Sequence, residues 1–174
     1  EAGHAVAAKC LPTQDKVHQV SIIPRGRAGG FTMSLPDHDK AYISKQEMFE
    51  DIVMAMGGRV AEEMIFGEIN TGASSDIQHA TKIATDMVTK YGMSEKLGSR
   101  SFGSNEEIFI GRDYGHAQNY SDATAALIDE EVDALIEKGY KKCREILTEH
   151  KDKLEAVAKA LIEKEVLTGE ELLE

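Results

Sequence analysis

The chain has 174 residues, of which 41% are hydrophobic and 29% charged, so it can form a packed domain and is neither disordered nor membrane-like in composition. Its formal net charge is −11, from 31 acidic and 20 basic residues, and no basic block stands out. Because such a surface would repel a phosphate backbone, nucleic acid is excluded as an expected partner.

The two cysteines, Cys10 and Cys143, lie far apart in the sequence and form no CxxC metal motif. We expect both to be buried, reduced thiols. No apolar run approaches the ~20 residues that a membrane-spanning helix requires, and no signal peptide opens the chain. We therefore expect a soluble fragment that makes no direct membrane contact, with any anchor lying outside it.

In chain order, the first predicted element is an Ala-rich helix over residues 2–11, which Pro12 ends. Two stretches with alternating, β-branched residues follow and predict strands over residues 17–23 and 30–35. A Gly-rich turn separates them. The pattern predicts a small sheet of two or three strands.

The part of the chain that follows has the periodicity of helices. A helix is predicted from residue 44 to 67, where a Ser-x-x-Glu capping box opens it and apolar residues recur at steps of three and four. Gly57 and Gly58 interrupt this helix, which indicates a kink or close backbone packing against a neighbour. A further helix is predicted to begin near Asp76 and to stop at Gly92.

The last third of the chain is also mostly helical. Residues 98–120 are Gly-rich and irregular, with a short strand predicted at 108–110. Long helices are predicted over 121–150 and 152–164, and a short turn over 167–174. The fold class is therefore mainly α, with a small two- to three-stranded β element.

The opening stretch EAGHAVAAKC places Glu1 and His4 three residues apart, near one face of the first helix. If a His precedes Glu1, the stretch reads H-E-x-x-H, in which two His bind zinc and the Glu acts on the zinc-bound water. By itself, E-x-x-H is more often a pair of ordinary helix residues. Such a zinc site also needs a third protein ligand from elsewhere.

A second acid-x-x-His pair, Asp76 and His79, leaves two alternatives open. Asp76 stands where an N-cap or first-turn acid is common, so capping alone would explain it. With Glu62 and Glu63 as bridging acids, the pair could instead belong to a di-metal carboxylate bundle. The second alternative is forced, because Asp replaces Glu and predicted strands interrupt the bundle.

Several segments together carry a resemblance to one family. EAGHA, VHQVSIIPRGRAGGFT, GGRVAEEMIFG, TGASSDIQHAT, MVTKYGMSEKLG and ALIDEEVDALI resemble, in order and spacing, the peptidase domain of the FtsH-type AAA+ zinc metalloproteases. Each segment alone would be weak, but the ordered set is specific. The resemblance extends from Glu1 to the last helices.

The resemblance implies roles for particular residues. The family motif is HEAGH, so the chain as given is expected to begin one residue inside it. By position, Glu1 is implied as the catalytic base, and His4 and Asp76 as zinc ligands. Glu62 is implied as an outer partner of a zinc-bound His. His79 has no place in the family's ligand set, which disfavours the di-metal alternative.

The resemblance also implies organisation and function. It implies a zinc peptidase domain over residues 1–174, with 121–174 as a C-terminal helical part and with transmembrane and AAA+ ATPase regions lying outside this stretch. The implied activity is Zn²⁺-dependent endopeptidase cleavage of unfolded membrane and cytosolic proteins. An ATP- and Mg²⁺-dependent unfoldase ring would supply these substrates, in a homo-hexamer that serves protein quality control.

The strand near GGFT is implied to be the edge onto which a substrate chain is added. The parent protein is expected in the bacterial inner membrane with this domain facing the cytoplasm, or in an organellar membrane. A non-catalytic oligomerisation fragment is the remaining alternative. With His4 and Asp76 as its only expected ligands, the chain as given is expected to be a poor enzyme.

Overall fold

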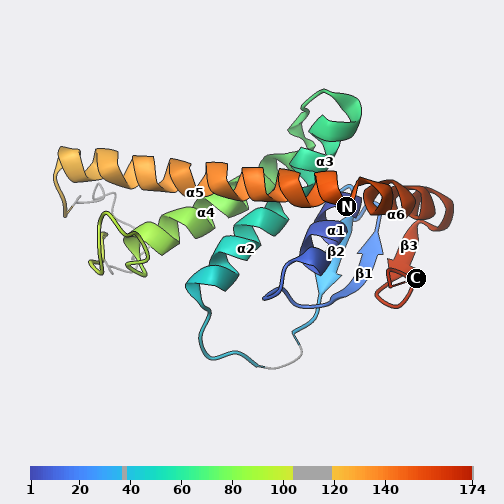
Figure 1. The fold of residues 1–174 in the computed structure, drawn as a ribbon, viewed down its shortest axis with the longest axis horizontal. Coiled ribbons are helices and arrows are strands. Elements are labelled where there is room, and N and C mark those ends of the chain that lie inside the picture. Colours follow the sequence, from blue (N-terminus) through green and yellow to red (C-terminus); the bar gives the residue numbers. More distant parts are fainter. Residues whose placement is uncertain (37–38, 104–118, 174) are drawn as a thin grey trace.

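The computed structural model describes residues 1–36, 39–103 and 119–173, and it confirms a mainly helical fold with a small sheet (Figure 1). The predicted strand at 108–110 lies outside the described residues. Among the described residues, no helix is both long and apolar enough to cross a membrane. The elements are α1 (Ala2–Cys10), β1 (Val17–Ser21), β2 (Phe31–Ser34), α2 (Lys45–Ala55), α3 (Gly57–Phe66), the 3₁₀ turn η1 (Thr71–Ala73), α4 (Ser74–Thr89), α5 (Asp122–Glu149), α6 (Lys151–Lys164) and β3 (Val166–Thr168).

Helix α5 runs along the long axis of the molecule and organises the other helices (Figure 1). Helices α2 and α4 pack against it and against each other, while α1 contacts α3, α5 and α6. The shared apolar core lies between these helices and one face of the sheet. Its completely buried side chains include Ile52, Val53, Val60, Ala80, Ala84, Cys143 and Leu147.

The predicted interruption at Gly57 and Gly58 is confirmed, and both of its suggested causes are present. Helix α2 ends at Ala55 and α3 begins at Gly57. A Cβ atom on Gly57 would lie 2.7 Å from the backbone nitrogen of His4, and one on Gly3 would lie 2.1 Å from the carbonyl oxygen of Gly57. The backbones of α1 and α3 are therefore in direct contact, which requires glycine on both sides.

The sheet has three antiparallel strands in the order β2-β1-β3. Val20 at its centre pairs with Thr32 on one side and Leu167 on the other. The sequence pattern predicted a terminal turn that included residues 167 and 168, and this part of the prediction was wrong. Strand β3, residues 166–168, pairs with β1 on the side opposite β2. Because β1 is far away in the sequence, no local pattern could indicate this pairing. The opposite edge, on β2, pairs with β1 alone among the described strands.

The two cysteines differ in environment. Cys143 is completely buried, and burial raises the pKa of its thiol to about 12, so it stays a protonated core residue. Cys10, at the end of α1, is exposed, so the prediction that it is buried was wrong. The helix ends at this residue, and its side chain falls on the outer side.

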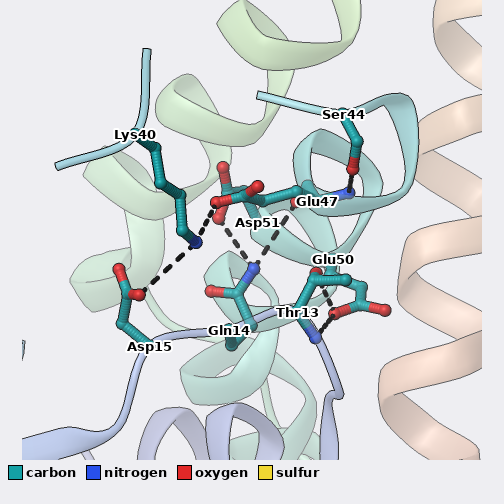
Figure 2. Close-up of polar contacts among 8 residues, drawn as sticks. All are labelled: Thr13, Gln14, Asp15, Lys40, Ser44, Glu47, Glu50 and Asp51. Atoms are coloured by element: carbon teal, nitrogen blue, oxygen red, sulfur yellow. Dashed lines mark hydrogen bonds and ion pairs between the residues drawn. The ribbon is translucent and has the colours of Figure 1, made fainter. Parts of the chain in front are cut away.

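Polar contacts attach the turn after α1 to helix α2 (Figure 2). Thr13 donates to one carboxylate oxygen of Glu50 from its hydroxyl and from its backbone N–H, the latter at 2.8 Å. The Gln14 amide donates to Asp51 at 2.9 Å. Glu50 is buried, with 4% of its surface exposed. These bonds hold the turn after α1 against α2.

One acid in this cluster predicts a pH-dependent stability. Burial raises the pKa of Asp51, and the Gln14 hydrogen bond opposes that rise. The pKa of Asp51 is higher in the folded chain than in the unfolded chain, so ionisation of Asp51 destabilises the fold. This destabilisation is complete at neutral pH. It disappears at a pH low enough to protonate Asp51 in both the folded and the unfolded chain. Asp51→Asn keeps an acceptor for Gln14, so we expect it to raise the free energy of unfolding at pH 7. Urea unfolding should show that gain shrinking towards pH 4.

The exposed acid Asp129 on α5 provides the matched control. Asp129→Asn should change the free energy of unfolding little, and equally at both pH values. A gain from Asp51→Asn that was the same at pH 7 and pH 4 would contradict the assigned pKa shift.

Candidate metal centre

Glu1 and His4 lie at the N-terminal end of α1, where Glu1 is the N-cap residue. The run of alanines after them favours helix, and the Glu1 carbonyl accepts the first helical bond from the Ala5 N–H at 3.0 Å. Residues three apart share one face of a helix. The sequence therefore builds a rigid element that carries both side chains at one end.

The His4 ring is held in one orientation by α2 and α3. Its Nδ1 lies 2.8 Å from the carbonyl oxygen of Met54. Because a carbonyl only accepts, Nδ1 carries the proton, and in the neutral ring Nε2 presents a lone pair. Beside Nε2 lies Gly58, where an added Cβ would stand 2.8 Å away. The His4 side chain is 13% exposed, so the ring lies in a confined space.

Asp76 meets this nitrogen from a different helix. It lies in the first turn of α4, and its Oδ2 is 3.2 Å from His4 Nε2. The N-cap of α4 is Ala73, and no side-chain capping bond is made there. Capping through a hydrogen bond therefore does not account for Asp76, although a first-turn acid still interacts favourably with the helix dipole.

The chemistry of this pair fits a zinc ion. A neutral imidazole nitrogen and a carboxylate oxygen are both zinc ligands, and bonds of about 2.0–2.2 Å at a tetrahedral angle separate two such atoms by roughly 3.3 Å. The hydrogen bond from Nδ1 to a carbonyl is the usual outer contact of a metal-binding His. Among the described residues, no group of three or more His, Cys, Asp or Glu could hold a metal. His4 and Asp76 could thus supply two of the ligands of such a site.

Glu1 is oriented by the neighbouring strand β2. The Thr32 hydroxyl donates to Glu1 Oε2 at 2.7 Å. An added Cβ at Gly30 would stand 2.9 Å from Glu1 Cγ and 3.2 Å from Oε1. The carboxylate therefore lies against the start of β2, with one oxygen occupied by Thr32.

Glu62 lies on α3, and the family resemblance implies it as an outer partner of a zinc-bound His. Its carboxylate accepts from the side-chain amide of Asn70, while the position next to the His4 ring is taken by the carbonyl of Met54. Glu63 pairs with Arg144 at 3.5 Å, and His79 is exposed on α4. These acids and His79 form no metal cluster in the part of the chain that is described, which gives the di-metal alternative no support.

Three residues that contact the candidate site residues were not predicted from the sequence. Thr32, Met54 and Asn70 act through a hydroxyl, a carbonyl and an amide, none of which stands out in a motif. Asn70 precedes a Thr-Gly-Ala turn, and Asn is a common cap residue, so its capping role could have been predicted. The contact of Met54 with His4 is a backbone contact and leaves no mark on the sequence.

The close contact at Gly58 gives a testable prediction. Gly58→Ala would push the His4 ring out of its position, so we expect zinc affinity to fall by about tenfold or more, as for other outer contacts of metal ligands. The clash falls on a side-chain tip, and Ala favours helix by about 1 kcal/mol over Gly. Stability should therefore change little, and chelator-competition titration should show the loss of affinity.

Gly29→Ala is the matched control, because nothing lies within 4 Å of its added Cβ. It should leave zinc affinity unchanged. Undiminished affinity in Gly58→Ala would show that the His4 ring does not need this position.

An E-x-x-H helix whose His meets a carboxylate from a second helix is the arrangement expected of a zinc peptidase. Comparison with known proteins agrees with this class. The sequence profile of Peptidase family M41 matches residues 1–174. The chain belongs to this family.

Relatives of this chain carry consistent names. The chain is 58% identical over 172 residues to "ATP-dependent zinc metalloprotease FtsH 1" of Thermoanaerobacter sp. and 58% identical to "ATP-dependent zinc metalloprotease FtsH" of Caldicellulosiruptor bescii. In both cases the match covers 98% of this chain and 28% of the relative. The protein of that name from Bacillus subtilis is 48% identical over 174 residues, which is 99% of this chain and 27% of the relative. The chain thus spans about a quarter of the length of these proteins.

Proposed function

We propose that the chain is the zinc endopeptidase domain, residues 1–174, of an ATP-dependent protease. The observation that carries this proposal is the 3.2 Å approach of His4 Nε2, on α1, to Asp76 Oδ2, on α4. Membership of a peptidase family supports the same activity. The names of the relatives support zinc as the metal.

His4 and Asp76 would hold the zinc, with the third protein ligand supplied by a His directly before Glu1. When bound, zinc lowers the pKa of its water to about 7 and polarises the scissile carbonyl. The Nδ1–H of His4 donates a hydrogen bond to the carbonyl oxygen of Met54. This bond fixes the ring and leaves Nε2 available to the metal. Asp76 is fixed by the first turn of α4 and supplies one negative charge.

Glu1 acts as the general base in this proposal. Thr32 holds Oε2, which leaves Oε1 to accept a proton from the attacking water and to return it to the leaving amine. Residues three apart lie near one face of a helix, so Glu1 would stand close to a metal held by His4.

The position of β2 supports binding of an extended peptide. It is an edge strand among the described strands, and its Thr32 touches the base. A substrate added to this edge would bind through main-chain hydrogen bonds, which require no particular side chains. We therefore propose unfolded protein chains, from the membrane and the cytosol, as substrates.

The parent protein is proposed to deliver these substrates. An ATP-driven unfoldase ring and a membrane anchor would lie in the remaining three quarters, in a homo-hexamer of the bacterial inner membrane with this domain in the cytoplasm. The words "ATP-dependent" in the relatives' names support the ATP-driven step, and the share of their length that this chain leaves uncovered is large enough for further regions.

Zinc-dependent cleavage tests the proposal. The chain with one His added before Glu1 should cleave a permanently unfolded protein, lose activity to a chelator and regain it with zinc. His4→Ala in the same chain should abolish cleavage. Cleavage that survived both the chelator and His4→Ala would contradict the proposal. Rings without cleavage in sedimentation and activity assays would favour an oligomerisation role instead.

A further inference from the structure

Asn70 joins the two helices that frame the metal centre. Its side-chain amide nitrogen donates to Glu62 on α3, and its Oδ1 accepts from the Gly72 N–H at 2.7 Å. Both polar ends of one side chain are therefore used. One end faces α3 and the other faces the turn η1, which leads directly into α4.

The contacts on α3 connect this residue with His4. Gly58 lies against His4 Nε2, and Glu62 follows four residues later on the same helix. Residues four apart occupy one face of a helix. The same face of α3 therefore touches the His ligand at one turn and holds Asn70 at the next.

The turn held by Asn70 leads directly into the helix that carries Asp76. Asn70 is the N-cap of η1, and α4 begins at Ser74, two residues before Asp76. An added Cβ on Gly72 would lie 2.9 Å from Asn70 Oδ1, so the residue after Thr71 leaves room for this cap. Helix α4 has no side-chain cap of its own. Asn70 supplies the side-chain anchor at this end.

We propose that Asn70 and Glu62 are a positioning pair that sets Asp76 at ligand distance from His4. Neither residue binds the metal. Helix α3 acts as the common reference, with Gly58 locating the His4 ring and Glu62 locating the Asp76 turn through Asn70. The inference rests on the proposed function, because it assumes that His4 and Asp76 share a zinc ion.

A donor–acceptor exchange tests the pair. All variants are made in the chain with one His before Glu1 and with Cys10→Ser, because the exposed Cys10 thiol could bind zinc. Zinc affinity is measured by competition with a chromophoric chelator. We expect Asn70→Ala and Asn70→Asp each to weaken zinc binding by about tenfold or more, the range for outer contacts of metal ligands. In Asn70→Asp, two carboxylates face each other and no donor remains.

The double variant Asn70→Asp with Glu62→Gln restores the hydrogen bond with donor and acceptor exchanged. We expect it to recover most of the lost affinity, which a merely weakened fold would not do. Ser121→Ala removes another side-chain cap, at the start of α5 and away from the site, and should leave zinc affinity unchanged. The thermal midpoint of each variant is measured alongside.

The outcomes separate the two ideas. Recovery in the double variant, with no effect of Ser121→Ala, supports the positioning pair. Unchanged affinity in Asn70→Ala, or a double variant no better than Asn70→Asp, would overturn it while leaving the zinc site intact. Absence of zinc binding in the unsubstituted chain would instead overturn the proposed function, and the positioning pair with it.

Discussion

Glu1→Gln is expected to retain zinc and to lose turnover. Gln keeps the shape of the side chain and an oxygen that can accept from Thr32, but it cannot take a proton at neutral pH. General base catalysis contributes about 10²–10⁴-fold, so kcat should fall by that factor while zinc affinity stays the same. Single-turnover cleavage of an unfolded protein and a chelator titration measure the two quantities.

Glu68→Gln is the control, because Glu68 is an exposed glutamate after α3. It should leave both turnover and zinc affinity unchanged. Turnover of Glu1→Gln close to that of the unsubstituted protein would remove Glu1 from the role of base.

Asp76→Asn is expected to weaken zinc binding more than any outer contact does, by more than about 100-fold. The amide is a poor zinc ligand and carries no charge. Because Asp76 makes no capping hydrogen bond, the fold should survive. The loss of a first-turn acid should lower the free energy of unfolding by no more than about 1 kcal/mol.

Asp122 is the matched control, since it is the first-turn acid of α5. Asp122→Asn should produce a similar small loss of stability without any change in zinc affinity. If Asp76→Asn unfolded the protein, or bound zinc normally, Asp76 would be a structural residue rather than a ligand.

Much of the fold could be predicted from local patterns. The helix starting after Ser44, the break at Gly57 and the long α5 follow from capping, glycine and apolar periodicity, all of which act within a few residues. Strand β3 could not be predicted, because three residues gain their conformation only by pairing with β1 far away in the sequence. The exposure of Cys10 depends likewise on which neighbours surround the end of α1.

The candidate site, too, could be predicted only in part from local sequence patterns. The three-residue spacing of Glu1 and His4 predicts that they share one face of a helix. Spacing alone did not predict that Asp76 meets His4, since that contact joins residues on separate helices. The family resemblance supplied this pairing, and the structure brings the two side chains together. Glu62 was implied as an outer partner of a zinc-bound His; its hydrogen bond among the described residues is with Asn70, so that role stays a prediction.

The central claim is that His4 and Asp76 bind one zinc ion, and locating that ion tests the claim most directly. Crystals of the chain with one His before Glu1, grown with zinc and measured at the zinc absorption edge, should show one anomalous peak. The peak should lie about 2.0–2.2 Å from both His4 Nε2 and an Asp76 carboxylate oxygen. A peak confined to Cys10, or no peak between His4 and Asp76, would contradict the zinc site.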